Sequence, residues 1–165
     1  MSKRVRQYVG LLTAILAYYV IHEGAHLLYA VCIGAFKRIH FIGLGMQIDV
    51  YVEMMTTKQM GIFCVLGSIA TAAVAYSLVA LIDKIAKNKS KVFKAGMYYV
   101  TLALLLIDPL YLSILCGSFG GGDMNGISLL IPESVARVVY GFIFVINVVI
   151  FIKIVLPKYK IAFTE

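Results

Sequence analysis

Charged residues are scarce in this sequence. They make up 14% of its 165 residues, whereas hydrophobic residues make up 62% and the mean hydropathy is +0.95. A soluble domain is roughly half apolar and a quarter charged, so this composition excludes an ordinary soluble domain and indicates a protein that crosses a membrane several times. The length suits one compact unit, and we expect a single domain over residues 1–165.

The sequence also lacks paired cysteines and a basic stripe. Its three cysteines lie far apart and form no C-x-x-C pair, so we interpret them as small buried hydrophobic residues. The formal net charge of +7 could indicate nucleic-acid binding. However, the basic residues gather in short segments between apolar runs, and no basic stripe with interleaved aromatic residues occurs. We therefore expect no nucleic-acid partner and interpret the charge as a signal of membrane topology.

Four apolar stretches are long enough to cross a bilayer, which takes about 20 residues. They lie near residues 9–33, 60–82, 95–116 and 135–156. The basic N-terminus before the first stretch imitates a signal peptide, but that stretch is too long for one, so we expect it to remain as a span. Asn147 in the last stretch predicts a hydrogen bond between helices. The connection from Asp83 to Lys94 carries five lysines and predicts a solvated loop.

The connection after the first stretch predicts a β-hairpin. Residues 36–42 and 46–52 are β-rich runs separated by Gly43-Leu44-Gly45. The exposed edge of this hairpin could bind an extended peptide through backbone hydrogen bonds, or the hairpin could only cover the bundle. We therefore predict an all-α membrane protein, a four-transmembrane-helix bundle with a small β-hairpin after the first helix.

One pentapeptide within the first stretch carries the chemistry, His22-Glu23-Gly24-Ala25-His26. Residues four apart share a helix face, so both imidazoles can bind one metal ion while Glu23 acts on a metal-bound water. Zinc lowers the pKa of such a water to near neutrality. The alternative is a polar patch whose side chains only hydrogen-bond to one another between packed helices. Histidines and a glutamate are costly inside a membrane, which favours a functional site.

Two aspartates compete for the place of third metal ligand. Asp108 is followed by Pro109, and we expect this pair to interrupt the third span. Asp123 lies within the glycine-rich segment 117–126, whose backbone can bend to bring a carboxylate to a metal. This flexibility favours Asp123 as the ligand, and Asp108 then suits a supporting position that accepts an imidazole N–H.

These residues resemble the site-2 protease family of intramembrane zinc metalloproteases, particularly its small members without a PDZ domain. The resemblance covers the HExxH motif, the hairpin, Gly122-Asp123, and residues 67–71 (Gly-Ser-Ile-Ala-Thr), which are similar to the family's Gly-Pro-Leu-Ala-Asn. The sequence departs from the family in having Gly122-Asp123-Met124 where Leu-Asp-Gly is usual. The resemblance implies that His22, His26 and Asp123 bind Zn²⁺ and that Glu23 is the general base. We assign Asn125 as a hydrogen-bond donor to the oxyanion.

We expect a zinc metalloendopeptidase that hydrolyses peptide bonds of membrane-embedded or membrane-proximal substrates. The alternative is a non-catalytic metal-binding membrane protein, an inactive homologue or a chaperone. A transporter is a third possibility, but four spans without internal repeats offer little for alternating access.

The distribution of positive charge predicts the orientation. Eleven of the fifteen lysines and arginines lie at the termini or in the second connection, and four lie on the opposite side. The positive-inside rule then places both termini in the cytoplasm and the hairpin outside, in a multi-pass protein of a prokaryotic plasma membrane. The family resemblance implies the opposite arrangement, with the hairpin toward the cytosol.

Overall fold

The computed structural model describes residues 2–43, 45–118 and 120–164, and most of these are helical. Four helical segments are long and apolar enough to cross a membrane: Lys3–Cys32, Thr57–Ala80, Lys91–Ser118 and Glu133–Thr164. This confirms the predicted helical architecture with four candidate spans and a small hairpin. The structure extends the first and last segments beyond the predicted stretches, because a helix can continue past its apolar part into residues that bear charge.

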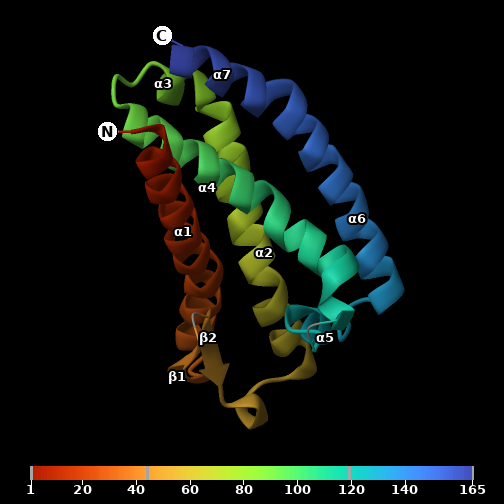
Figure 1. Ribbon diagram of the computed structural model, residues 1–165. Helices are drawn as coiled ribbons and strands as arrows, with labels where there is room; N and C mark the ends of the chain where they lie inside the picture. The colour runs from red at the N-terminus through yellow and green to blue at the C-terminus, as the bar shows by residue number, and fades with distance from the viewer. Residues whose placement is uncertain (1, 44, 119, 165) are drawn as a thin grey trace.

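The elements follow one another in a simple order (Figure 1). The long helices are α1 (Lys3–Cys32), α2 (Thr57–Ala80), α4 (Lys91–Leu110) and α6 (Glu133–Ile150). Shorter elements are β1 (Phe36–Ile42), β2 (Gly45–Val50), η1 (Val52–Met54), α3 (Ile82–Ala86), η3 (Cys116–Ser118), α5 (Asp123–Ile127) and α7 (Leu156–Thr164). Two π-helical turns, η2 (Tyr111–Leu115) and η4 (Phe151–Val155), continue α4 and α6.

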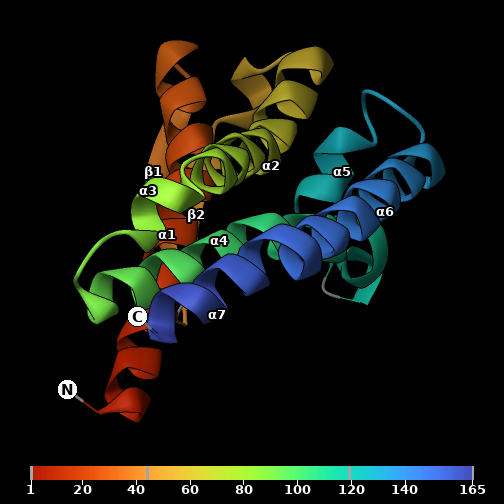
Figure 2. The ribbon, with the colours of Figure 1, turned by 90° about the horizontal axis from the view of Figure 1, so that it is seen from above.

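Helix α4 is the centre of the bundle and packs against α1, α2 and α6 (Figure 2). Both termini and α3 lie at one end of the molecule, whereas the hairpin and α5 lie at the other (Figure 1). Buried side chains form one cluster around Leu104 and Leu105 and a second around Phe63 and Leu112. Large apolar side chains such as Leu16 and Phe142 remain exposed on the outer helix faces, as expected of helices that contact lipid.

The predicted hairpin is present. Strands β1 and β2 pair antiparallel, with Ile39 opposite Ile48, and the register shifts between Phe36 and Arg38. The second strand ends at Val50, two residues earlier than predicted. Gly43 adopts a φ of +60° in the turn, and Leu44 of the predicted turn lies outside the described residues. Strand β2 packs on α1 and brings the hairpin beside the end of the first helix.

The expected interruption at Asp108 and Pro109 is wrong, because α4 continues through both residues to Leu110. Proline has no N–H, so Pro109 leaves the carbonyl of Leu105 without its usual helical partner. The Asn147 side chain on α6 donates to that carbonyl at 2.7 Å, and its own oxygen accepts from the Tyr76 hydroxyl at 2.7 Å. The predicted interhelical bond of Asn147 is thereby confirmed, and it explains how the helix tolerates the proline.

The expectation that the whole connection from Asp83 to Lys94 is a solvated loop is also wrong. Lys94 lies in α4 and is buried. Its ammonium group donates to the carbonyl of Ala162 and lies 5.9 Å from the centre of the Phe163 ring. The reason is that the last helical segment continues into α7, which packs on α4 and covers its first turn.

Candidate metal centre

The pentapeptide lies near the C-terminal end of α1, beside β2. His22 and His26 are one helical turn apart on the face that packs inward, and their relative exposures are only 7% and 3%. Their rings meet edge to face with centroids 4.9 Å apart. The helical spacing of the motif therefore brings two imidazoles side by side in the protein interior.

Each imidazole is held through its Nδ1 atom. His26 Nδ1 lies 2.8 Å from the carbonyl oxygen of Phe63, and His22 Nδ1 lies 3.2 and 3.3 Å from the two carboxylate oxygens of Asp108. Asp108 is buried and also accepts hydrogen bonds from the hydroxyls of Tyr18 and Thr71. Because these partners are acceptors, we assign the ring hydrogen to Nδ1, and each Nε2 then presents a lone pair.

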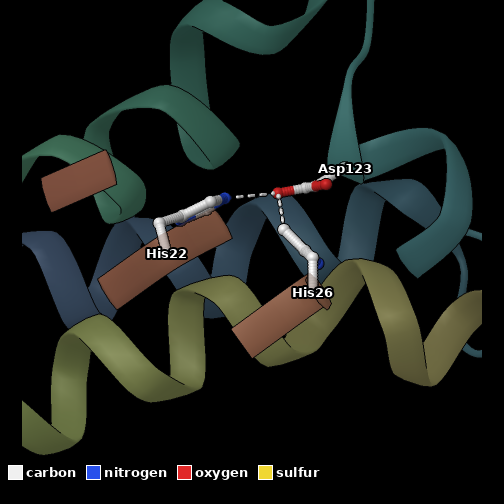
Figure 3. A group of neighbouring side chains, drawn as sticks. All are labelled: His22, His26 and Asp123. Atoms are coloured by element: carbon white, nitrogen blue, oxygen red, sulfur yellow. Dashed lines mark hydrogen bonds and ion pairs between the residues drawn. The ribbon is translucent and has the colours of Figure 1, made fainter. Parts of the chain in front are cut away.

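Asp123 completes a cluster of three donor atoms. It opens α5 after three glycines with positive φ, from Gly120 to Gly122, so this backbone reaches a conformation that other residues rarely adopt. Its Oδ2 atom lies 3.0 Å from His22 Nε2 and 3.5 Å from His26 Nε2 (Figure 3). The three donor atoms lie within 4.8 Å of one another.

This donor set fits a cation. Two imidazole lone pairs and a carboxylate oxygen converge, and a positive charge is what satisfies all three at once. The cluster of His22, His26 and Asp123 could therefore hold a metal ion.

A proton can bridge the same groups when no metal is bound. Burial raises the pKa of Asp123, but hydrogen bonds from His22 and His26 and their charge outweigh it and lower that pKa to about 2. The carboxylate is therefore ionised at neutral pH. Protons on the imidazoles compete with a metal for this site, so metal binding releases protons.

Gly67 on α2 makes room for the cluster. A Cβ atom at this position would lie 2.6 Å from His22 Nε2 and 2.7 Å from His26 Nε2, far inside van der Waals contact. The packing of the small residues of the second span against the first therefore has a specific consequence. It lets the α2 backbone lie directly against the two atoms that would bind a metal.

A cavity of about 370 Å³ opens onto the donor atoms. Glu23 lines it from α1, and Gln47, Ile48 and Asp49 line it from β2. The Asp49 carboxylate accepts a hydrogen bond from Arg38 at 2.7 Å, and this bond lowers the pKa of Asp49. Glu23 accepts a hydrogen bond from the Ile48 backbone but forms no ion pair among the described residues. No cation therefore holds its carboxylate, which can act on a bound water.

The structure separates the expected site residues into two groups. His22, Glu23, His26 and Asp123 share one cavity, and Asp108 lies behind His22. Asn125 is exposed, donates to the Gly120 carbonyl at 3.1 Å, and does not line the cavity. Sequence reasoning missed Tyr18 and Tyr111. Tyr18 precedes His22 by one helical turn and Tyr111 follows Asp108 by three residues, so helical spacing could have revealed both.

Comparison with known proteins adds no family assignment. No protein-family model, no curated protein and no solved structure matches this chain.

Proposed function

We propose that this protein is an intramembrane zinc metallopeptidase of the site-2 protease family, which hydrolyses peptide bonds of membrane-embedded or membrane-proximal substrates. One observation carries the proposal: Glu23 shares a cavity with the converging donor atoms of His22, His26 and Asp123. Three protein ligands with one position left for water is the arrangement of catalytic zinc sites. A purely structural zinc site has four protein ligands, and the described cluster offers three.

Each residue then has a defined role. His22, His26 and Asp123 hold the zinc ion, while Asp108 and the Phe63 carbonyl orient the imidazoles. Bound zinc supplies Lewis acidity, which activates water and polarises the scissile carbonyl. Glu23 takes the proton of the attacking water and passes it to the leaving amine.

The hairpin supplies a place for the substrate. Gln47, Ile48 and Asp49 bring β2 to the wall of the same cavity. An extended peptide that pairs with this strand through backbone hydrogen bonds would run past Glu23 and the metal ligands. A transmembrane substrate must unwind locally to do so, and we therefore expect glycine or other helix-weakening residues near the cleaved bond.

A cleavage assay in reconstituted bilayers tests the proposal. The substrate is a transmembrane peptide with a glycine-weakened segment, and wild type is compared with Glu23→Gln at equal zinc content. We expect Glu23→Gln to keep its zinc and to lose about 10²- to 10⁴-fold in rate, the usual contribution of a general base. Glu53→Gln is the matched control, because Glu53 is exposed on η1 and does not line the cavity. Equal cleavage by wild type and Glu23→Gln would refute Glu23 as the general base, and no cleavage by wild type would leave only a metal-binding protein.

A further inference from the structure

Tyr111 lies in the wall of the same cavity and has no role in the mechanism proposed above. It is the first residue of the π-helical turn η2 and lines the cavity together with Glu23 and the three metal-binding candidates. A π-helical turn adds a residue to the helix and so redirects the side chains near it, and such turns are frequent at functional sites. The irregular turn thus begins at a tyrosine that lines the cavity of the candidate catalytic groups.

The backbone beside Asp123 leaves room for the Tyr111 hydroxyl. A Cβ atom at Gly122 would lie 2.5 Å from this hydroxyl oxygen, and Gly122 has a φ of +47°. Only glycine permits both the backbone conformation and the close approach. The hydroxyl therefore lies directly beside the residue that precedes Asp123.

This hydroxyl is an unused donor. It forms no hydrogen bond with any residue that the structure describes. Most other donors in the cavity wall are occupied or weak, because the Nδ1 atoms of both histidines face Asp108 and Phe63 and a thiol such as Cys64 donates weakly. Gln47 offers an amide, but it lies exposed on the hairpin.

We infer that the Tyr111 hydroxyl donates a hydrogen bond to the oxyanion that forms when water adds to the scissile carbonyl. The inference rests on the proposed function and replaces Asn125 in that role. The water oxygen bonds to the carbonyl carbon, the carbonyl electron pair moves onto its oxygen, and Glu23 takes the water proton. The carbonyl then re-forms, the C–N bond breaks, and Glu23 gives the proton to the amine nitrogen. Tyr111 keeps its own proton throughout and stabilises the oxyanion.

Tyr111→Phe removes the hydroxyl and keeps the ring. We expect an unchanged zinc content, a KM within about threefold of wild type, and a kcat lower by about 10²- to 10³-fold, the usual cost of losing an oxyanion donor. Tyr140→Phe is the matched control, because that hydroxyl pairs with Ser68 at 2.7 Å and does not line the cavity. An unchanged kcat in Tyr111→Phe overturns the inference. A loss of zinc that parallels the loss of activity also overturns it, because Tyr111 would then position Asp123.

A binding measurement separates this inference from the proposed function. A peptide phosphonate imitates the tetrahedral oxyanion, and its affinity for the zinc-loaded protein requires no catalysis. We expect Tyr111→Phe to weaken phosphonate binding by the same factor as kcat/KM, and Tyr140→Phe to leave it unchanged. If wild type cleaves no peptide but Tyr111→Phe still binds the phosphonate more weakly than wild type, the peptidase proposal is contradicted while the oxyanion site is supported. Equal phosphonate binding by wild type and Tyr111→Phe, or none by wild type, overturns the inference.

Discussion

At the scale of single residues, His22 lies between two carboxylates with different tasks. Asp123 faces its Nε2 atom from a glycine-rich turn, and Asp108 faces its Nδ1 atom from inside a helix. Asp108 already accepts hydrogen bonds from Tyr18 and Thr71, so its oxygens are engaged on the side away from the cavity. This division favours our proposal that Asp123 is a metal ligand and that Asp108 orients the imidazole.

Zinc content distinguishes these two tasks. We expect Asp108→Ala to weaken zinc binding about 10- to 100-fold, the usual cost of losing an outer partner of a metal ligand. Asp123→Ala should weaken it further, because a donor atom itself is lost. Equilibrium titration with a zinc-sensitive dye measures both affinities. The reverse ordering would mean that Asp108 is the ligand.

Gly67 offers a second test at this scale. In Gly67→Ala the new methyl group would displace both Nε2 atoms, so we expect zinc affinity to fall by at least the same 10- to 100-fold, roughly the penalty for disturbing the surroundings of a metal ligand. Gly24→Ala is the control, because a Cβ atom there meets nothing within 4 Å although Gly24 belongs to the motif. Thermal unfolding of both metal-free variants checks that they fold. Full zinc affinity in Gly67→Ala would contradict the geometry of the cluster.

The sequence predicted the metal-binding candidates more completely than their surroundings. The spacing of His22 and His26 is a local property of a helix, and it suffices to place both imidazoles on one face. The close approach of Gly67 and the hydroxyl of Tyr111 depends on how separate helices pack. Helical spacing can place Tyr111 on the same face as Asp108, but no local pattern specifies these contacts between helices. For the same reason the sequence predicts Asn125 as a donor, whereas in the structure it lies outside the cavity.

At the scale of elements, the third span shows how tertiary contacts override a local signal. Asp108 followed by Pro109 predicts a break, but the Asn147 amide satisfies the carbonyl that the proline leaves open, and α4 continues. Sequence patterns did predict the hairpin, because alternating β-rich runs and a glycine turn are local. The burial of Lys94 could not be predicted in this way, because it depends on α7 returning to α4.

A double-mutant cycle tests the link between Asn147 and Pro109. We expect Asn147→Leu to lower the free energy of unfolding by about 1–2 kcal/mol, because the Leu105 carbonyl loses its partner. In a Pro109→Ala background the restored N–H can reach that carbonyl, so the cost should shrink by about 0.5–1.5 kcal/mol. The lost bond to Tyr76 contributes equally in both backgrounds. Detergent unfolding followed by circular dichroism measures the free energies of unfolding. An identical loss on Asn147→Leu in the two backgrounds would contradict this explanation.

At the scale of the whole molecule, the candidate metal centre lies toward one end of the bundle. The hairpin and α5 lie at that end, and both termini and α3 lie at the other (Figure 1). Most lysines and arginines belong to the end with the termini. We propose a multi-pass protein of a prokaryotic plasma membrane with cytoplasmic termini, which places the cleavage chemistry near the outer surface.

Cysteine labelling in intact cells tests this orientation. Cys32 is exposed and is first replaced by serine, whereas Cys64 and Cys116 are buried. Single cysteines are then introduced as Phe41→Cys in the exposed part of β1 and as Lys89→Cys between α3 and α4. We expect an impermeant maleimide to label position 41 in intact cells and position 89 only after permeabilisation. The opposite pattern would refute cytoplasmic termini and agree with the orientation implied by the family resemblance.

The proposed function requires one metal ion bound by His22, His26 and Asp123. The most direct test is an anomalous difference map from crystals of zinc-loaded protein, recorded on both sides of the zinc absorption edge. We predict a single peak bounded by His22 Nε2, His26 Nε2 and Asp123 Oδ2, at about 2.0–2.2 Å from each atom. No peak in this cluster, or a peak bound instead by Asp108, would contradict the central claim.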